Sequence, residues 1–385
     1  MKKALMNASV ASMIYQFNMN NIDILEELGY QVDVACNFGK ENPMKDTEIA
    51  KFKKNLMDRG IKVIETDCPR SPLAFRKLVS TYKQLKNLAD SEVYDLIHTQ
   101  SPIGGALCRL AFRKARKKGT KVIYTAHGFH FYKGAPLKNW FIYYPIEKIC
   151  SHMTDILITI NKEDYERAKR RLHARKTAYI PGVGINVKKI QEGVSEKRLE
   201  IRKELGLEKD DIVLLSVGEL NKNKNHELVI RAISELKDLN IKYIICGQGP
   251  LQEHLKKLAK KLGIEDRLFL LGFRSDVIDV YKSADVFIFP SKREGLSVAL
   301  MEAMACGLPC VVSAIRGNKD LIDKEGGCIF GNNSVLECKH AIEFILSSDR
   351  NEIGGYNQKK ICDFSILEVS CGVKELYKYI EEIGN

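Results

Sequence analysis

Two glutamates, Glu294 and Glu302, flank a short segment whose residue types could hold a phosphorylated sugar. The segment follows an apolar run of strand type, Val286–Phe289, and leads into residues 296–305, which have helical composition. The free amides of a first helical turn, here residues 295–297, attract phosphate oxygens. Carboxylates on either side of such a turn suit the hydroxyl groups of a sugar and of a ribose.

An isolated pair of glutamates usually belongs to a solvated helix face. Here the strand–loop–helix–strand order of residues 284–313 is typical of an open α/β sheet. Ligands bind outside the carboxyl ends of the strands in such sheets, and Glu294 lies just past a strand end. The order of the elements therefore favours a binding site.

The loop of residues 218–225, GELNKNKN, has the features of a phosphate-binding loop. It follows a predicted strand and contains Lys222 and Lys224, and a lysine is a mobile point charge suited to phosphate. Lysines in loops are mostly just solvated, so the prediction depends on the position of this loop at the end of a strand.

In the amino-terminal half, His127 follows a predicted strand directly. A lone histidine is more often a packed or surface residue, but strand ends are where sites form in α/β sheets. A His-x-x-His pair with no third ligand nearby is weak evidence for a metal, so no metal site is predicted.

These candidates need two open α/β sheets to hold them, and 385 residues suit two domains of ordinary size. Strands are predicted at 3–7, 31–36, 62–65, 96–98, 121–125 and 155–159 in the first half, and at 212–218, 243–246, 268–272, 286–289 and 310–313 in the second. A loop of small residues is predicted at 8–12. The segment 178–187, with its proline and glycines, marks the domain boundary.

The net charge of +12 requires an anionic partner, which could be nucleic acid, an anionic membrane surface or a phosphorylated substrate. A predicted helix at 104–118 is either a solvated face or a membrane contact; its basic residues are Arg109, Arg113, Lys114, Arg116, Lys117 and Lys118.

The eleven cysteines form no CxxC pair and favour free thiols in a reducing cytoplasm. The amino terminus begins like a signal peptide but lacks its long apolar stretch, and no window approaches the 18 apolar residues of a membrane span.

The stretch 284–313, with Pro-Ser, Glu-Gly-Leu-Ser and Ala-Cys-Gly-Leu-Pro in register, resembles the donor-binding signature of family-4 glycosyltransferases. The resemblance implies an α/β fold of the GT-B class, two Rossmann-like domains with a cleft between them. It further implies that Glu294 contacts the donor sugar, that Glu302 binds the ribose, and that His127 lies beside the reacting sugar. The implied catalytic residues are His127, Lys224 and Glu294, and the donor-binding residues are Gly218, Lys222, Gly249, Arg274, Gly295, Leu296, Ser297 and Glu302. The residues that it implies on the acceptor side are Ser9, Ser12, His98 and His130.

The same resemblance assigns the domains. Residues 1–183 form an acceptor-binding Rossmann-like domain, which the C-terminal helix 366–385 completes, and residues 184–365 form the donor-binding Rossmann-like domain. The sequence departs from the family pattern at Glu219, where relatives often have a phosphate-binding arginine. An acid cannot bind phosphate directly, so Lys222, Arg293 or the helix amides must supply that charge. Relatives often have a Gly-Gly pair where Arg316 and Gly317 stand.

The resemblance implies transfer of a hexose or N-acetylhexosamine from a nucleotide diphosphate sugar, which we take to be UDP-linked, to a hydroxyl group with retention of configuration. No Asp-x-Asp motif occurs, so we predict a reaction that needs no metal and no cofactor besides the sugar nucleotide. Residues 8–36 and the HGFHFYKG segment resemble enzymes that build bacterial capsule and exopolysaccharide. They imply a lipid-linked saccharide acceptor and a cytoplasmic protein held peripherally at the inner face of the cell membrane.

Three other hypotheses are open from the sequence. A nucleotide-sugar epimerase has the same architecture, and a non-catalytic sugar-nucleotide-binding protein would explain the missing arginine. A nucleic-acid-binding protein would explain the charge, but no helix-turn-helix, zinc ligand set or aromatic and basic strand signature is found. We therefore predict no nucleic acid partner.

Overall fold

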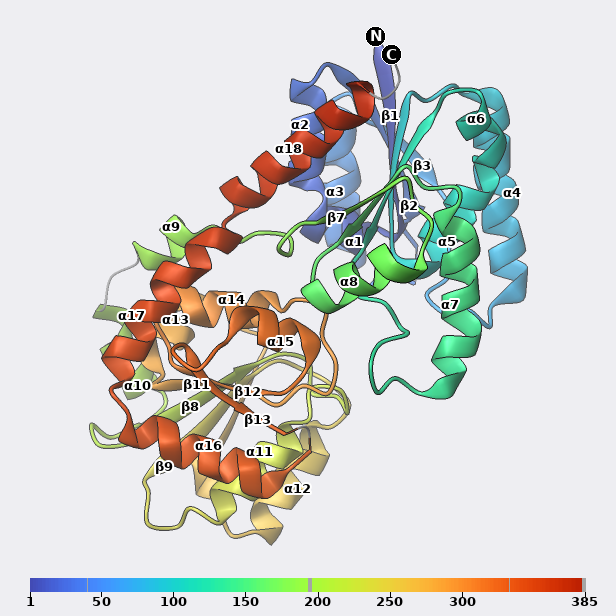
Figure 1. Ribbon diagram of the computed structural model, residues 1–385. Helices are drawn as coiled ribbons and strands as arrows, with labels where there is room; N and C mark the ends of the chain where they lie inside the picture. The colour runs from blue at the N-terminus through green and yellow to red at the C-terminus, as the bar shows by residue number, and fades with distance from the viewer. Residues whose placement is uncertain (40, 193–195, 332, 383–385) are drawn as a thin grey trace. The chain divides into compact units, whose positions relative to one another are not determined.

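The computed structural model describes residues 1–385 except 40, 193–195, 332 and 383–385, and of 196 and 197 it describes the backbone alone. The chain folds into two compact units. Unit 1 consists of Met1–Val183 and the C-terminal stretch that begins at Val369, and unit 2 is Gly184–Glu368. Each unit is a parallel sheet with helices on both faces (Figure 1).

The sheet of unit 1 has seven strands in the order β3-β2-β1-β4-β5-β6-β7, all parallel. The strands are β1 (Lys2–Val10), β2 (Tyr30–Asn37), β3 (Lys62–Glu65), β4 (Leu96–Gln100), β5 (Lys121–Ala126), β6 (Ile156–Thr159) and β7 (Lys176–Tyr179). The order reverses beside β1, and an open sheet binds ligands at the carboxyl ends of the strands near such a point.

Helices cover both faces of this sheet. They are α1 (Ala11–Phe17), α2 (Met19–Glu27), α3 (Asp46–Asp58), α4 (Phe75–Ser91), α5 (Pro102–Ala111), α6 (Arg113–Lys117), α7 (Leu137–Ser151), α8 (Lys162–Arg171) and α18 (Ile366–Glu382). One apolar core joins α2, α3 and α18 to the sheet, and another joins α4 and α5 to its other face. The C-terminal helix is thus part of the core of unit 1 from Val369 onward.

Unit 2 has six parallel strands in the order β10-β9-β8-β11-β12-β13. They are β8 (Ile212–Val217), β9 (Ile241–Cys246), β10 (Leu268–Gly272), β11 (Val286–Phe289), β12 (Cys310–Ser313) and β13 (Gly327–Phe330). The helices are α9 (Val187–Gln191), α10 (Glu196–Glu204), α11 (His226–Ser234), α12 (Gln252–Lys261), α13 (Val277–Ser283), α14 (Val298–Ala305), α15 (Arg316–Leu321), α16 (Val335–Ser347) and α17 (Arg350–Lys360). Short 3-10 turns occur at Glu265–Arg267 and Ile361–Phe364.

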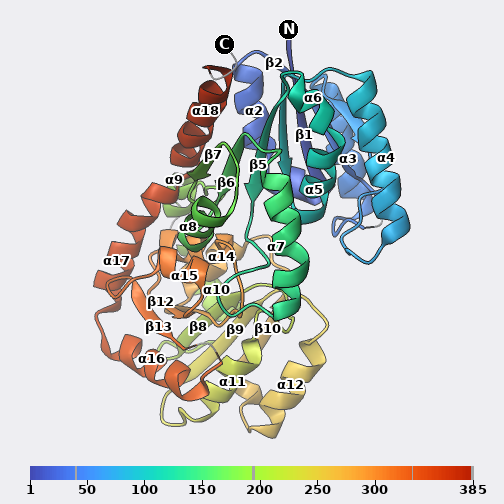
Figure 2. The same ribbon diagram turned by 45° about the vertical axis from the view of Figure 1, so that its right-hand side comes forward.

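Apolar cores also form on both faces of this second sheet. One contains buried residues of α13 and α14, and the other contains buried residues of α11, α12 and α16 (Figure 2). Among the described residues, no helix combines the length and the apolar character needed to cross a membrane.

The start of unit 1 differs from the prediction of a loop at 8–12. Strand β1 continues to Val10, and α1 begins directly after it. The Ser9 hydroxyl lies 2.7 Å from the Ser101 hydroxyl and accepts a hydrogen bond from the Gly104 amide at 3.1 Å. These bonds tie the end of β1 to the segment after β4, so the small residues form an ordered strand end.

The predicted single helix over 104–118 is two helices, α5 and α6. The Arg109 side chain is fully buried and forms an ion pair with Glu147 at 3.0 Å, and Arg116 pairs with Asp155 at 2.7 Å. Two of the six basic side chains are therefore paired within unit 1, and Arg109 is too deeply buried to contact a membrane.

Candidate active site

The turn between β11 and α14 lies at the carboxyl edge of the sheet of unit 2. Strand β11 ends at Phe289, and α14 begins at Val298 with Ser297 as its N-cap. The Ser297 hydroxyl accepts a hydrogen bond from the Leu300 amide at 3.4 Å. A cap of this kind fixes where the helix begins, and so it fixes the place of Glu294 just before the helix.

The two loops that the sequence singled out in unit 2 meet through an ion pair. Lys224 Nζ lies 2.8 Å from Glu294 Oε1, and both side chains are more than four-fifths buried. The ammonium group also lies 4.7 Å from the centre of the Phe289 ring. A cation and an acid from separate loops are thus held side by side at a strand end.

Helix α15 supports the same turn from the other side. A Cβ atom on Gly317 would lie 2.1 Å from the Gly295 carbonyl oxygen, so the two backbones can touch only with glycine here. Arg316 is buried, and its Nε donates to the Glu294 carbonyl oxygen at 3.1 Å. Arg316 therefore holds the backbone of Glu294, a role that the sequence reasoning did not assign.

Glu302 lies on α14 beside Tyr281 of α13. The Tyr281 hydroxyl is 3.3 Å from Glu302 Oε2 and 2.9 Å from the Ala299 carbonyl oxygen. Burial raises the pKa of Glu302, and the Tyr281 hydrogen bond opposes this rise. A carboxylate held in such a place gains from hydroxyl groups that donate to it.

The glycines of this region allow backbones to approach each other. A Cβ atom on Gly218 would lie 3.0 Å from Lys224 Cε, and one on Gly249 would lie 2.5 Å from the Leu220 carbonyl oxygen. Gly218 therefore makes room for the Lys224 side chain, and Gly249 packs against the loop that carries it.

Arg274 and Lys222 have different surroundings. Arg274 forms ion pairs with Glu204 and Asp276, each at 2.7 Å, so its guanidinium group is already bound within unit 2. Lys222 is exposed and has no hydrogen-bond partner among the described residues. Of the two, Lys222 is the one available to an anion.

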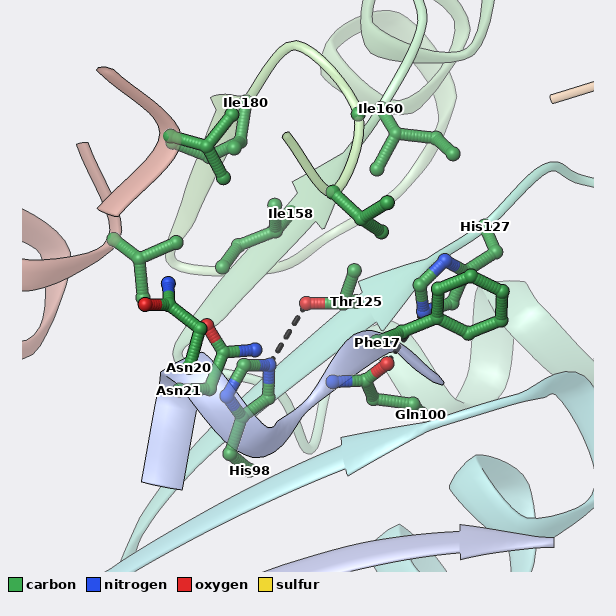
Figure 3. A pocket seen from close by; sticks show the side chains of 14 residues that line it. Phe17, Asn20, Asn21, His98, Gln100, Thr125, His127, Ile158, Ile160 and Ile180 are labelled. Atoms are coloured by element: carbon green, nitrogen blue, oxygen red, sulfur yellow. Dashed lines mark hydrogen bonds between the residues drawn. The ribbon is translucent and has the colours of Figure 1, made fainter. Parts of the chain in front are cut away.

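A buried network in unit 1 surrounds the two strand-end histidines (Figure 3). His98 is fully buried, with Nδ1 2.7 Å from the Tyr377 hydroxyl and Nε2 2.8 Å from the Thr125 hydroxyl. Because both ring nitrogens bind within unit 1, His98 supports its neighbours and has no nitrogen left for a substrate. Burial lowers the pKa of His98 to about 3.

The hydrogen bonds around His127 define its tautomer. The Asn18 amide nitrogen donates to the Met13 carbonyl oxygen at 2.9 Å, so Asn18 Oδ1 faces Gln100 and accepts from its amide nitrogen. Gln100 Oε1 is then the acceptor for His127 Nε2. Burial lowers the pKa of His127 to about 4, so the ring is neutral at pH 7 and Nδ1 is an acceptor.

The three other acceptor-side candidates line one cavity of about 310 Å³ in unit 1. Ser9 and Ser12 come from the end of β1 and the start of α1, and His130 stacks on Tyr143 with ring centres 4.4 Å apart. Ser12 is buried and its hydroxyl has no partner among the described residues. Gln16, Arg70 and Ser101 also line the cavity, so its wall combines apolar surface with several polar groups that could bind hydroxyl groups. His98 and His127 line a separate cavity of about 30 Å³.

Within the part of the chain that the structure describes, no three His, Cys, Asp or Glu residues are grouped to hold a metal. Tyr377 and Arg316 are the residues of these sites to which sequence reasoning gave no role. Nothing in the sequence around Tyr377 indicates a role in the site, because the residue lies in a helix far along the chain. Arg316 could have been identified, because it replaces a glycine of the family pattern.

Models of two known families match the chain. The model of Glycosyltransferase Family 4 matches residues 21–186, and that of Glycosyl transferases group 1 matches residues 197–360. The Bacillus subtilis glycosyltransferase EpsD is 37% identical over 330 residues, which are 85% of this chain and 82% of EpsD. The chain belongs to the family-4 glycosyltransferases.

One further relative and one solved structure were compared with this family-4 glycosyltransferase. The Escherichia coli UDP-Gal:alpha-D-GlcNAc-diphosphoundecaprenol alpha-1,3-galactosyltransferase is 28% identical over 378 residues, covering 95% of this chain and 93% of that protein. The crystal structure of Anabaena HepE in complex with UDP superposes with a TM-score of 0.76 at 18% identity, over 98% of this chain and 100% of HepE. The predicted family and the predicted GT-B fold are therefore confirmed.

Proposed function

We propose that this family-4 glycosyltransferase moves a hexose or N-acetylhexosamine from a UDP-sugar to a hydroxyl group of a lipid-linked saccharide, with retention of configuration and without a metal. The observation that carries the proposal is the pair of Lys224 and Glu294 at the start of α14, with Glu302 farther along that helix. One cation, two acids and the start of a helix are thus found at the same edge of the sheet of unit 2.

The donor would bind with its diphosphate at Lys224 and at the amides before α14. Negative charge develops on the leaving diphosphate, and fixed positive groups that meet this charge lower the barrier. Glu294 and Glu302 would accept hydrogen bonds from hydroxyl groups of the sugar and of the ribose. Lys222 and Arg293 are the exposed cations that fit the place of the family's arginine, because Arg274 is already paired.

Retention is supported by the Escherichia coli relative, whose name gives an alpha linkage formed from UDP-Gal. In the proposed step the bond from the anomeric carbon to the phosphate oxygen breaks. The acceptor oxygen bonds to the same face of that carbon, and its proton passes to the leaving phosphate. His127 would accept a hydrogen bond from a sugar hydroxyl at Nδ1, the nitrogen that its tautomer leaves free.

The acceptor would bind to unit 1 in the cavity lined by Ser9, Ser12 and His130. A lipid-linked acceptor follows by analogy with the same relative, whose name includes diphosphoundecaprenol. A protein that acts on such a substrate must reach a membrane surface, so we include peripheral membrane association and a role in bacterial surface polysaccharide synthesis in the proposal.

The test combines the protein with a panel of UDP-hexoses and UDP-N-acetylhexosamines, a short-chain prenyl diphosphate saccharide and a chelator. The proposal requires a product longer by one sugar, with an alpha linkage by NMR. Free sugar-nucleotide isomers without product would favour an epimerase. Binding without turnover of any donor would favour a non-catalytic binding protein, and loss of transfer in the chelator would reject the metal-free mechanism.

A further inference from the structure

Helix α7 of unit 1 exposes an almost continuous apolar side. Phe141 is 78% exposed, Leu137 75% and Ile149 60%, and Ile142 and Ile146 are exposed between them. With Pro145, these residues recur at helical spacing, so they form one stripe along the helix. Large apolar side chains exposed singly are common, but a contiguous stripe marks an interaction surface.

The opposite side of α7 is firmly packed, so the exposed stripe does not result from a poorly placed helix. Glu147 forms the buried ion pair with Arg109 of α5, and Cys150 is buried. Trp140 and Tyr144 pack around Phe131 with ring centres 5.8 and 5.3 Å away. The helix is thus anchored by its inner side, and unit 1 leaves its outer side uncovered.

The charges on α7 show which partner suits this stripe. The acid of α7 is Glu147, which is buried and paired, while the exposed charged residues are Lys138 and Lys148. At helical spacing both lysines lie on the same side as the apolar residues, and an exposed side of apolar and basic residues without exposed acids matches the interface of an anionic bilayer. A second copy of the chain would bring the same lysines against each other, which charge repulsion disfavours.

The neighbouring helix α4 continues this character. Both α4 and α7 pack on α5, and Figures 1 and 2 show the three helices beside one another in unit 1. At the start of α4, Phe75 is 70% exposed and Val79 is exposed, together with Arg76. The two helices that pack on α5 therefore both expose apolar and basic side chains.

We propose that the outer side of α7, with the start of α4, docks this protein on an anionic lipid surface by inserting the side chains of Phe141, Ile142, Ile146 and Ile149 at the headgroup level. The proposal rests on the proposed function only in that a lipid-linked acceptor requires a membrane. It replaces the helix over 104–118 as the docking element, because Arg109 and Arg116 of that segment bind within unit 1.

The test is co-sedimentation with vesicles of phosphatidylcholine alone or mixed with phosphatidylglycerol. The apolar variant combines Phe141→Ser and Ile149→Ser, and the matched control combines Leu336→Ser and Phe344→Ser on α16, which are 57% and 56% exposed. We expect the wild type to bind the mixed vesicles and the apolar variant to bind about tenfold more weakly, since two inserted side chains are lost. The control should bind within about twofold of the wild type, because its residues lie on another unit.

A second variant combines Lys138→Glu and Lys148→Glu and should remove the preference for phosphatidylglycerol. All variants should transfer sugar to a water-soluble acceptor at the wild-type rate, which separates docking from catalysis. The docking proposal would be overturned if the wild-type protein binds neither kind of vesicle, or if the apolar variant binds as tightly as the wild type. This holds even if sugar transfer occurs. A wild-type dimer that the apolar variant converts to monomer would assign the stripe to a second copy instead. Docking without any transfer would reject only the proposed function.

Discussion

The pair of Lys224 and Glu294 yields a prediction that separates stability from catalysis. Lys224 Nζ and Glu294 Oε1 are 2.8 Å apart, and the exposed fraction of the side chain is 18% for Lys224 and 17% for Glu294. At an effective dielectric constant of about 20 their attraction is about 6 kcal/mol. Desolvation offsets most of this, so we expect a coupling free energy of about 1 to 3 kcal/mol.

The experiment is a double-mutant cycle with Lys224→Met, Glu294→Gln and both together. Each single change should lower the free energy of unfolding of unit 2 by about 1 to 3 kcal/mol, because it leaves a part-buried partner unpaired. The double variant should lose less than the sum. Urea unfolding is followed by far-UV circular dichroism, which reports both units, and by fluorescence of Trp140, which lies in unit 1. The urea midpoint reported by Trp140 should stay unchanged, so the shift seen only in circular dichroism belongs to unit 2.

Sugar transfer by the same variants should not show this recovery. Lys224→Met should lower kcat about 100-fold or more, since a fixed donor to the leaving group is lost. The double variant should be no more active than the poorer single variant, because we propose that both residues also contact the donor. As a control pair, Lys256 and Glu253 are exposed on α12, and their coupling should not exceed about 0.5 kcal/mol, with activity unchanged. Coupling near zero, or activity restored in the double variant, would refute the reasoning.

Three further predictions concern other residues. Glu302→Ala should weaken UDP binding about tenfold or more, because a hydrogen bond to a charged group is worth about 1.5 to 3 kcal/mol. The variant should not lower the melting temperature, since burial disfavours the charged form of this carboxyl group. Unchanged UDP affinity in calorimetry would remove the assignment of Glu302 to the ribose. Gln100→Leu should lower kcat with the fold retained in circular dichroism, because His127 then loses the bond that selects its tautomer; an unchanged kcat would argue against that role. Burial lowers the pKa values of His98, His127 and His226 to about 3, 4 and 4, so their stabilisation is complete above pH 6.5 and is lost as the pH falls toward 4. Near pH 5 the unfolded chain then takes up about three protons, and the free energy of unfolding should fall by up to about 4 kcal/mol per pH unit; a flat urea midpoint between pH 6.5 and 5 would contradict this.

The strands of both sheets could be predicted from the sequence where an apolar run was bounded by polar residues or glycine. Each of the eleven predicted strands is present, whereas β7 (Lys176–Tyr179) and β13 (Gly327–Phe330) were not predicted. Both are four-residue edge strands that pair on one side only. β7 (KTAY) has no continuous apolar run, whereas the apolar run of β13 (GCIF) is only three residues long and follows two glycines. Such strands are defined by their neighbours in the sheet more than by their own composition.

The sequence predicted site residues only where they lie close to a predicted strand end or helix start. The pair of Lys224 and Glu294 was placed by two loops that each follow a strand, and the structure joins them. The contact of Tyr377 with His98 joins residues 279 positions apart, which no local pattern can show. The exposure of Phe141 could not be predicted from the sequence either, because its aromatic neighbours Trp140 and Tyr144 pack against a buried cluster.

The measurement that tests the central claim most directly is a crystal structure of this protein with UDP bound. The account predicts the diphosphate at Lys224 and the amides before Ser297, and the ribose hydroxyls on Glu302. UDP bound elsewhere on the chain, with this sheet edge empty, would contradict it.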